Sequence, residues 1–429
     1  MSLRKYAAIA ALASVPLMMT LGNSMLIPIL PELARELGVK AFQISLIITI
    51  YSVVAILLIP IAGYLSDRFG RKKVMIPALM LAAAGGLLSA LASSIGDGSY
   101  MLVMLGRFIQ GAGAAGAFPI VFPLTGDLFK EEEEASSVLG LVETSNTFGK
   151  VLSPIAGSLI ALWTWYMPFY AIPVLSIISA AMILFFIHTP KPANGEEREK
   201  PKFSAFWAQV KTIFKNEGKW LSGVFVSGGA GMFAIFTTLF YLSERLETQY
   251  GYKGVMKGAL LAIPLSALCL ASFLTGKWIG ERKALMKWLS VGGMSLLSAS
   301  ALVCALFPPA TLAMWFVWIG IGSIGIGVML PCMDALITEG IEKEERGTVT
   351  SIYSSMRFIG VAAGPPLAAL LMDNGARPVF WTVAGVSIVT VASILLLIKP
   401  EAESKTKGTN GGTERYQPKR AVAARNKTT

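Results

Sequence analysis

Four ionisable side chains interrupt long apolar stretches of this chain: Arg107, Glu143, Lys150 and Arg357. A charge is costly in such surroundings, so these residues are candidates for proton exchange or for binding a charged molecule. Glu143 is the only carboxylate that falls well inside an apolar stretch, and we expect it to be the proton carrier, with Asp334 as the next candidate. Glu143 and Lys150 are seven residues apart. On a helix they share one face but lie roughly 10 Å apart along its axis, too far for a direct ion pair.

The sequence gives little indication of metal binding, disulfide formation or enzyme catalysis. Cys269, Cys304, Cys332 and the single histidine, His188, have no metal-ligand spacing, and three cysteines form no disulfide framework. The sequence contains no phosphate-binding glycine loop, no set of nucleophile and base, and no pore-filter motif. We therefore predict no metal, no cofactor and no enzyme activity, and we expect neither ATP-driven transport nor a channel.

The elements that carry these residues are membrane-spanning helices. Hydrophobic residues make up 54% of the 429 residues and charged residues 15%, whereas soluble proteins carry about 25% charged residues. Apolar runs of roughly 20 residues recur, each long enough to cross a bilayer as a helix and too long for barrel strands or a signal peptide. The predicted spans are 7–30, 43–65, 74–95, 100–126, 137–161, 166–188, 219–243, 256–277, 286–307, 310–334, 349–372 and 378–398.

A polar segment divides the spans into two sets of six. We expect an N-terminal six-helix half at 1–188, a cytoplasmic linker at 189–218, a C-terminal six-helix half at 219–398 and a disordered basic tail at 399–429. Most of the 37 Lys and Arg residues lie in alternate loops and at both ends of the chain, which predicts that both termini are cytoplasmic. This bias explains much of the net charge of +11. We therefore expect the lipid bilayer as a partner rather than nucleic acid, and a monomer.

The loop between the second and third spans reads GYLSDRFGRKK, residues 63–73. It resembles the loop signature of the major facilitator superfamily, and the resemblance implies a latch that holds the two halves in the outward-facing state. Asp67 is suited to accept hydrogen bonds from a helix N-terminus, where the helix dipole favours an anion. Arg71 is expected to pair with Asp127, and Gly63 to let another helix approach. The predicted latch comprises Gly63, Asp67, Arg68, Gly70, Arg71 and Asp127. The alternative is a basic loop that only fixes topology.

The fourth span contains GRFIQGAGAAGAF, which resembles the arginine-containing motif of the same family. The resemblance links Arg107 to proton coupling; the alternative is an arginine that ties the first span to the fourth. Asn23 stands where many drug antiporters of this family carry an acid, which moves the expected proton carrier to Glu143. The residues expected to line the substrate cavity are Asn23, Gln110, Lys150 and Arg357.

Two glycine–proline motifs lie 211 residues apart, GKVLSPIAGS in the fifth span and GVAAGPP in the eleventh. The first resembles the motif of drug–proton antiporters, although Ser153 and Ser158 replace two expected glycines. The offset indicates a duplicated six-helix unit, and proline bends a helix. The alternative is a kink that serves packing only. The motif residues are Gly149, Pro154, Gly157, Gly360, Gly364 and Pro365.

Together these patterns predict an all-α membrane protein of the major facilitator fold, in a bacterial plasma membrane. We expect a proton-coupled exporter of small organic compounds, a multidrug efflux transporter that works by alternating access with the proton gradient as its energy source. The alternatives are a dedicated exporter of an endogenous anionic metabolite such as a siderophore, and a proton-coupled uptake symporter. Lys150 and Arg357 favour an anionic or zwitterionic substrate, unless both pair with backbone carbonyls or extend towards the cytoplasm.

Overall fold

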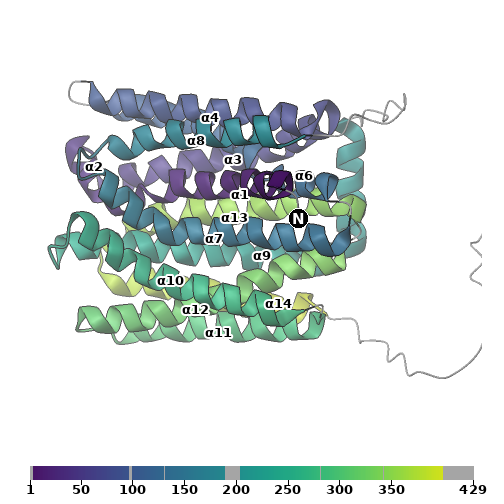
Figure 1. The fold of residues 1–429 in the computed structure, drawn as a ribbon. Coiled ribbons are helices and arrows are strands. Elements are labelled where there is room, and N and C mark those ends of the chain that lie inside the picture. Colours follow the sequence, from purple (N-terminus) through teal and green to yellow (C-terminus); the bar gives the residue numbers. More distant parts are fainter. Residues whose placement is uncertain are drawn as a thin grey trace, which may run out of the picture.

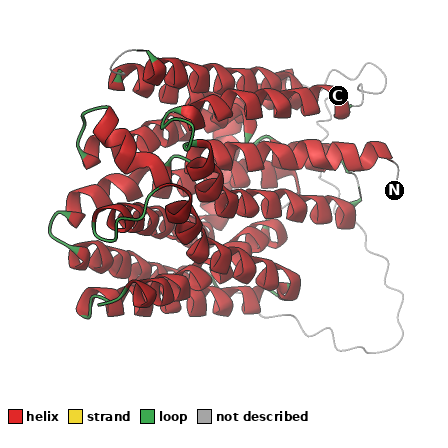
Figure 2. Cartoon of the chain, turned by 60° about the vertical axis from the view of Figure 1, so that its left-hand side comes forward, coloured by secondary structure: helices red, strands yellow, loops and turns green. Residues whose placement is uncertain are grey.

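Each apolar run of the sequence forms a helix, because a helix satisfies every backbone hydrogen bond within its own segment of the bilayer. The computed structural model describes residues 3–95, 99–129, 131–188, 203–280, 282–341 and 343–399. Over these residues the chain is helices and short connections, with no strand (Figure 2). The helices lie side by side and roughly antiparallel in one bundle (Figure 1).

The N-terminal half contains eight α-helices and one 3₁₀-helix. They are α1 (Leu3–Ser24), η1 (Ile27–Ile29), α2 (Leu30–Glu36), α3 (Ala41–Phe69), α4 (Arg71–Ser94), α5 (Tyr100–Ala117), α6 (Val121–Leu128), α7 (Glu132–Ile160) and α8 (Met167–Phe186). The helices of the C-terminal half are α9 (Phe203–Thr248), α10 (Gly254–Ile279), α11 (Lys283–Leu306), α12 (Leu312–Gly340), α13 (Lys343–Met372) and α14 (Ala376–Leu397).

Several helix boundaries differ from the sequence prediction, and the first, seventh and tenth predicted spans are examples. The first predicted span is interrupted after Ser24, and the chain continues through η1 and α2. Helix α9 begins at Phe203, so residues 203–218 of the predicted linker are helical, while 189–202 and the tail from residue 400 lie outside the described residues. Helix α12 continues to Gly340, six residues beyond its predicted end at Asp334. This last difference places Asp334 inside a helix of the bundle.

Eleven of the described helical segments are long and apolar enough to cross a membrane. The remaining crossing is α7, which has 29 residues but carries several acids, Lys150 and a row of Ser, Thr and Asn side chains. The polar residues of α7 include Glu143 and Lys150, two of the candidate functional residues. With α7 the structure shows the expected twelve crossings, and the prediction of an all-α fold is confirmed.

The two halves are built alike. Helix α1 packs against α7 and α8, and α9 packs against α13 and α14 in the same way. The glycines of the two predicted motifs form these contacts: a methyl group on Gly157 would overlap the Met25 carbonyl, which directly follows α1, and one on Gly360 would overlap the Gly229 carbonyl of α9. The halves meet along two seams, α3 with α13 and α7 with α10. This arrangement agrees with the duplication predicted from the sequence.

Because the crossings alternate in direction, the bundle has two ends. We call the end where the described chain begins and finishes the terminal face; it also holds the turn at Gly70 between α3 and α4 (Figure 1). The other end is the opposite face, where α2 lies and where α9 meets α10.

Candidate functional site

A cluster of charged side chains joins the two halves through three helices. The guanidinium of Arg357 on α13 lies 3.3 Å from Glu143 Oε1 on α7, and 3.6 Å from Asp334 Oδ1 on α12. The three side chains are mostly buried, with 11%, 25% and 29% exposed for Arg357, Glu143 and Asp334. The pair with Glu143 crosses between the halves, whereas the pair with Asp334 lies within the C-terminal half.

Neighbouring polar groups hold Glu143 in place. Asn146, one turn further along α7, donates from Nδ2 to Glu143 Oε1 at 3.0 Å. The hydroxyl of Thr20 on α1 donates in turn to the amide oxygen of Asn146. On the other side, the Arg357 guanidinium lies over the ring of Tyr353, 5.6 Å from its centroid. Glu143 and Arg357 therefore face each other from positions fixed by their own halves.

Lys150 is buried on the same helix as Glu143, with 7% of the residue exposed, and its Nζ makes no hydrogen bond within the described part of the chain. Asp334 Oδ2 is likewise buried and unbonded there. The Tyr353 hydroxyl faces the Asp334 carboxylate, whereas Lys150 Nζ is available to a further group. Glu143 is the only carboxylate well inside a predicted span, but α12 continues beyond its apolar run and places Asp334, the second candidate, inside the bundle as well. With two carboxylates and two cations, the cluster has no formal excess of positive charge.

Arg107 lies apart from this cluster and is fully buried. It donates to the Asn23 side chain, to Gln110 Oε1 at 2.6 Å and to the Ile47 carbonyl at 3.0 Å, and its guanidinium lies 4.6 Å from the centroid of the Tyr51 ring. These contacts link α5 to α1 and α3. All acceptors of the Arg107 guanidinium in the described chain are neutral. This favours a structural role, in which Arg107 links the first predicted span to the fourth, over direct proton coupling.

The predicted loop motif forms a charged turn at the terminal face. Arg71 Nε lies 2.5 Å from Asp127 Oδ2, and Arg71 Nη1 lies 3.0 Å from Asp67 Oδ1. The predicted pair of Arg71 with Asp127 is therefore present. Gly70 has a φ of +100°, which suits glycine at this sharp change of direction.

Other details of this loop differ from the prediction. A methyl group on Gly63 would meet nothing within 4 Å, so no neighbouring helix uses the space in this conformation. Arg68 donates to the Tyr64 hydroxyl at 3.0 Å, within its own helix. Lys72 donates to the carbonyls of Leu184 and Ile187 and thereby caps the end of α8. The described ion pairs of the loop stay inside the N-terminal half.

The opposite face carries a second ionic contact between the halves, which the sequence analysis did not anticipate. Glu247 at the end of α9 binds Arg35 of α2 and lies 2.6 Å from Lys257 of α10. Close by, Ser243 of α9 donates to the Ile27 carbonyl of η1, in the other half, at 3.0 Å. The halves are thus joined by polar contacts at this face. Sequence position alone put Arg35 between the first two predicted spans and Lys257 at the start of the eighth, with nothing to indicate that they meet.

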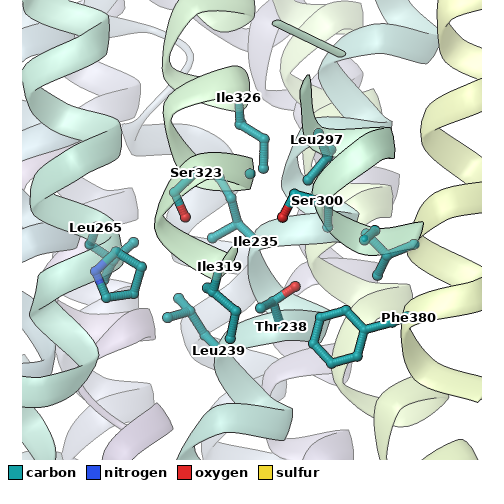
Figure 3. Close-up of a pocket in the computed structure, with 15 residues that line it drawn as sticks. Ile235, Thr238, Leu239, Leu265, Leu297, Ser300, Ile319, Ser323, Ile326 and Phe380 are labelled. Carbon is teal, nitrogen blue, oxygen red and sulfur yellow. The ribbon is translucent and has the colours of Figure 1, made fainter. Parts of the chain in front are cut away.

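Two pockets lie in the C-terminal half. The first, shown in Figure 3, is enclosed by α9–α12 and α14 and has a volume of about 20 Å³, room for little more than one water molecule. Ser300, Ser323 and Thr238 project into it among aliphatic side chains. The second, of about 480 Å³, is an apolar groove over α9 between α13 and α14. Neither is lined by the four residues predicted for the substrate cavity.

The described residues contain no group of three or more His, Cys, Asp or Glu side chains that could hold a metal ion. A buried ion pair between two similar helical halves, with unbonded charged atoms beside it, is the arrangement of a secondary transporter, in which a site at the repeat interface responds to movement of the halves.

The sequence profile described as Major Facilitator Superfamily matches residues 12–307 and 286–427. The chain belongs to this family, as the loop motif predicted: it is a multi-pass membrane transporter and not an enzyme.

Among curated relatives, the Bacillibactin exporter of Bacillus subtilis (strain 168) is 51% identical over 404 residues, which cover 94% of this chain and 99% of that protein. The Chloramphenicol resistance protein of Pseudomonas aeruginosa is 26% identical over 424 residues, covering 95% and 93%. Among solved structures, the human organic anion transporter MFSD10 (TETRAN) matches with a TM-score of 0.70 at 17% identity, covering 92% of this chain and all of that one. That likeness supports the fold alone.

Proposed function

We propose that this protein exports a siderophore of the bacillibactin type in exchange for protons. The observation that carries the proposal is the 51% identity to the Bacillibactin exporter, which extends over nearly the whole of both chains. The siderophore alternative of the sequence analysis is thereby favoured over general drug efflux. We place the protein in a bacterial plasma membrane, with the terminal face in the cytoplasm because the basic residues concentrate there.

The ion pair between the halves is the coupling element of this proposal. Glu143 and Arg357 form an ion pair between the halves at 3.3 Å, so any motion that separates α7 from α13 must break it. A proton taken up by Glu143 removes the charge that attracts Arg357 and lowers the cost of that separation. Arg107 supports the site indirectly by tying α5 to α1 and α3.

Lys150 supplies a site for an anionic group of the substrate. Its Nζ is buried and has no hydrogen-bond partner among the described residues, and a buried cation is costly unless it is paired. The cluster as a whole is neutral, so the expected preference for anionic substrates depends on this one unpartnered lysine. Asn23 and Gln110 already hold Arg107 and are less available to a substrate in this conformation.

The test is accumulation of bacillibactin in inside-out vesicles, with and without an imposed proton gradient. Glu143→Gln is expected to abolish gradient-driven accumulation while bacillibactin binding persists, because an amide cannot exchange the proton. Glu339→Gln is the matched control, since Glu339 is an exposed acid on α12. Accumulation that is independent of the gradient, or a Glu143→Gln variant as active as the parent, would contradict the proposal.

A second candidate function is multidrug efflux, favoured by the full-length similarity to the Chloramphenicol resistance protein. The same vesicles decide between the two when chloramphenicol and a quaternary ammonium dye compete with bacillibactin. We expect Lys150→Met to weaken bacillibactin binding at least tenfold, and Lys253→Met, which removes an exposed loop charge, to leave it unchanged. Strong dye transport that does not depend on Lys150 would favour multidrug efflux.

A further inference from the structure

Arg357 lies between two carboxylates that belong to different halves of the protein. Glu143 is contributed by α7 of the N-terminal half, and Asp334 by α12 of the C-terminal half, which also carries Arg357. The contact that crosses the halves is 3.3 Å long and the internal contact 3.6 Å. One guanidinium is therefore shared, and in this conformation the shorter contact is the one between the halves.

The charges are balanced within each half. The N-terminal half brings Glu143 and Lys150 to the cluster, and the C-terminal half brings Arg357 and Asp334. When α7 moves away from α13, the pair of Glu143 with Arg357 is lost, but Asp334 moves together with Arg357. A guanidinium left without a carboxylate in this buried position would be strongly disfavoured. Asp334 is the one described carboxylate that can prevent this without depending on the other half.

Asp334 also has the capacity to accept the guanidinium. Its Oδ2 is buried and makes no hydrogen bond within the described chain, so a small rotation of Arg357 can replace a single loose contact by a two-oxygen pair. The titratable groups that interact with Asp334 include Arg357, Glu143, Lys150 and the Tyr353 hydroxyl, together with the Cys332 thiol of its own helix.

We propose that Asp334 is a positioning residue for proton coupling: it receives Arg357 when the halves separate, so that Glu143 can bind a proton. The inference rests on the proposed function, because it assigns a role within the same coupling site, but it differs from a role for Asp334 as proton carrier. The proton goes from solvent to the Glu143 carboxylate, and Arg357 stays protonated throughout. Asp334 competes with Glu143 for Arg357, and this competition changes how readily Glu143 takes up the proton.

The expected consequence has a definite sign. In Asp334→Asn, Glu143 is the one anionic partner left to Arg357 among the described residues, so the ion pair between the halves is stronger and its opening requires more acidic solution. Loss of the Asp334 charge also removes its repulsion of the Glu143 carboxylate, which strengthens the same ion pair. We expect the midpoint of the pH response to fall by about one pH unit or more. A residue that only supported packing would lower activity without moving this midpoint.

The experiment follows the distance between spin labels on the two halves while the pH is changed, in purified full-length protein without substrate. Lys73→Cys and Ala284→Cys place labels at exposed sites where α4 and α11 begin, both at the terminal face. Cys269, Cys304 and Cys332 are first replaced by alanine. The label distance is expected to respond to pH in the parent and to lose this response in Glu143→Gln.

Asp334→Asn is expected to move the midpoint to lower pH, Asp334→Glu to restore it, and Asp373→Asn to leave it unchanged, since Asp373 lies exposed in the turn after α13. The inference is overturned if the parent shows no pH response, or if Asp334→Asn keeps the parent's midpoint. Bacillibactin transport is measured on the same preparations. A shifted midpoint in a protein that transports no bacillibactin would refute the proposed substrate and leave the role of Asp334 standing.

Discussion

At the opposite face, we expect substitution of Arg35 and substitution of Glu247 to have different effects on stability, although the two residues form one ionic contact. Glu247 binds Arg35 from the other half and Lys257 from its own half. Arg35→Gln removes only the link between the halves. Glu247→Gln removes that link and also leaves Lys257 without its carboxylate. The two variants neutralise one charge each, so a simple count of charges would predict equal effects.

The burial of the three side chains sets the magnitudes. The side chain of Arg35 is 53% exposed, and such a solvent-screened pair contributes at most about 1 kcal/mol. That corresponds to roughly a fivefold change in the equilibrium between closed and open states of this face. Glu247 and Lys257 are 4% and 3% exposed and lie 2.6 Å apart. Removal of one member of such a pair costs about 3–5 kcal/mol, and it does so in both states, because both residues belong to the C-terminal half.

Two measurements separate these effects. Thermal unfolding in detergent reports stability, and we expect a clear fall in midpoint for Glu247→Gln and none for Arg35→Gln. Maleimide labelling of Ser243→Cys reports opening, because Ser243 is buried in the seam and bonded to the Ile27 carbonyl. We expect Arg35→Gln to raise its labelling rate by up to about fivefold.

Exchange of the two charges is a stringent test. Arg35→Glu combined with Glu247→Arg restores an opposite pair across the halves but places an arginine beside buried Lys257. We therefore expect the double variant to be no more stable than Glu247→Gln. Full recovery of stability in the double variant, or a Glu247→Gln protein as stable as the parent, would refute this account of the cluster.

Two further predictions concern the terminal face and the helix packing. Asp67→Asn should insert normally but transport poorly, because it removes a charge that pairs with Arg71 at 3.0 Å; normal transport at normal abundance in the membrane would contradict a latch. Gly157→Ala should lower the free energy of unfolding by about 1–3 kcal/mol, because its methyl group would overlap the Met25 carbonyl. Gly140→Ala, on the same helix with open space around it, is the control and should be neutral or slightly stabilising in thermal unfolding.

Most of the architecture follows from composition and periodicity. A helix across a bilayer requires about 20 apolar residues, so the crossings and the division into halves can be read along the chain. A local motif also predicted a contact between neighbouring elements, Arg71 with Asp127, which is present in the structure, and the glycines of the two glycine–proline motifs, Gly157 and Gly360, lie at close helix contacts. Such contacts are accessible to sequence reasoning because glycine and charge have few uses inside a membrane.

The boundaries of the polar helices could not be predicted in the same way. A hydropathy pattern indicates where a helix leaves the apolar region of the bilayer. The helix itself ends where its backbone hydrogen bonds end, which can be several residues further on. Helix α12 continues to Gly340 although its apolar run stops near Asp334. For the same reason, the first residues of α9, from Phe203 onward, were predicted as part of the linker.

The sequence by itself determined that this is a membrane transporter of two similar halves, and it identified Glu143, Lys150 and Arg357 as charged residues within it. Only the tertiary structure decided which of them meet. Arg357 reaches Glu143 across 214 residues of sequence, and Arg35 reaches Glu247 across 212. The angular position and tilt of each helix in the bundle decide these pairings, and those depend on side-chain packing summed over many contacts rather than on any repeat in the chain.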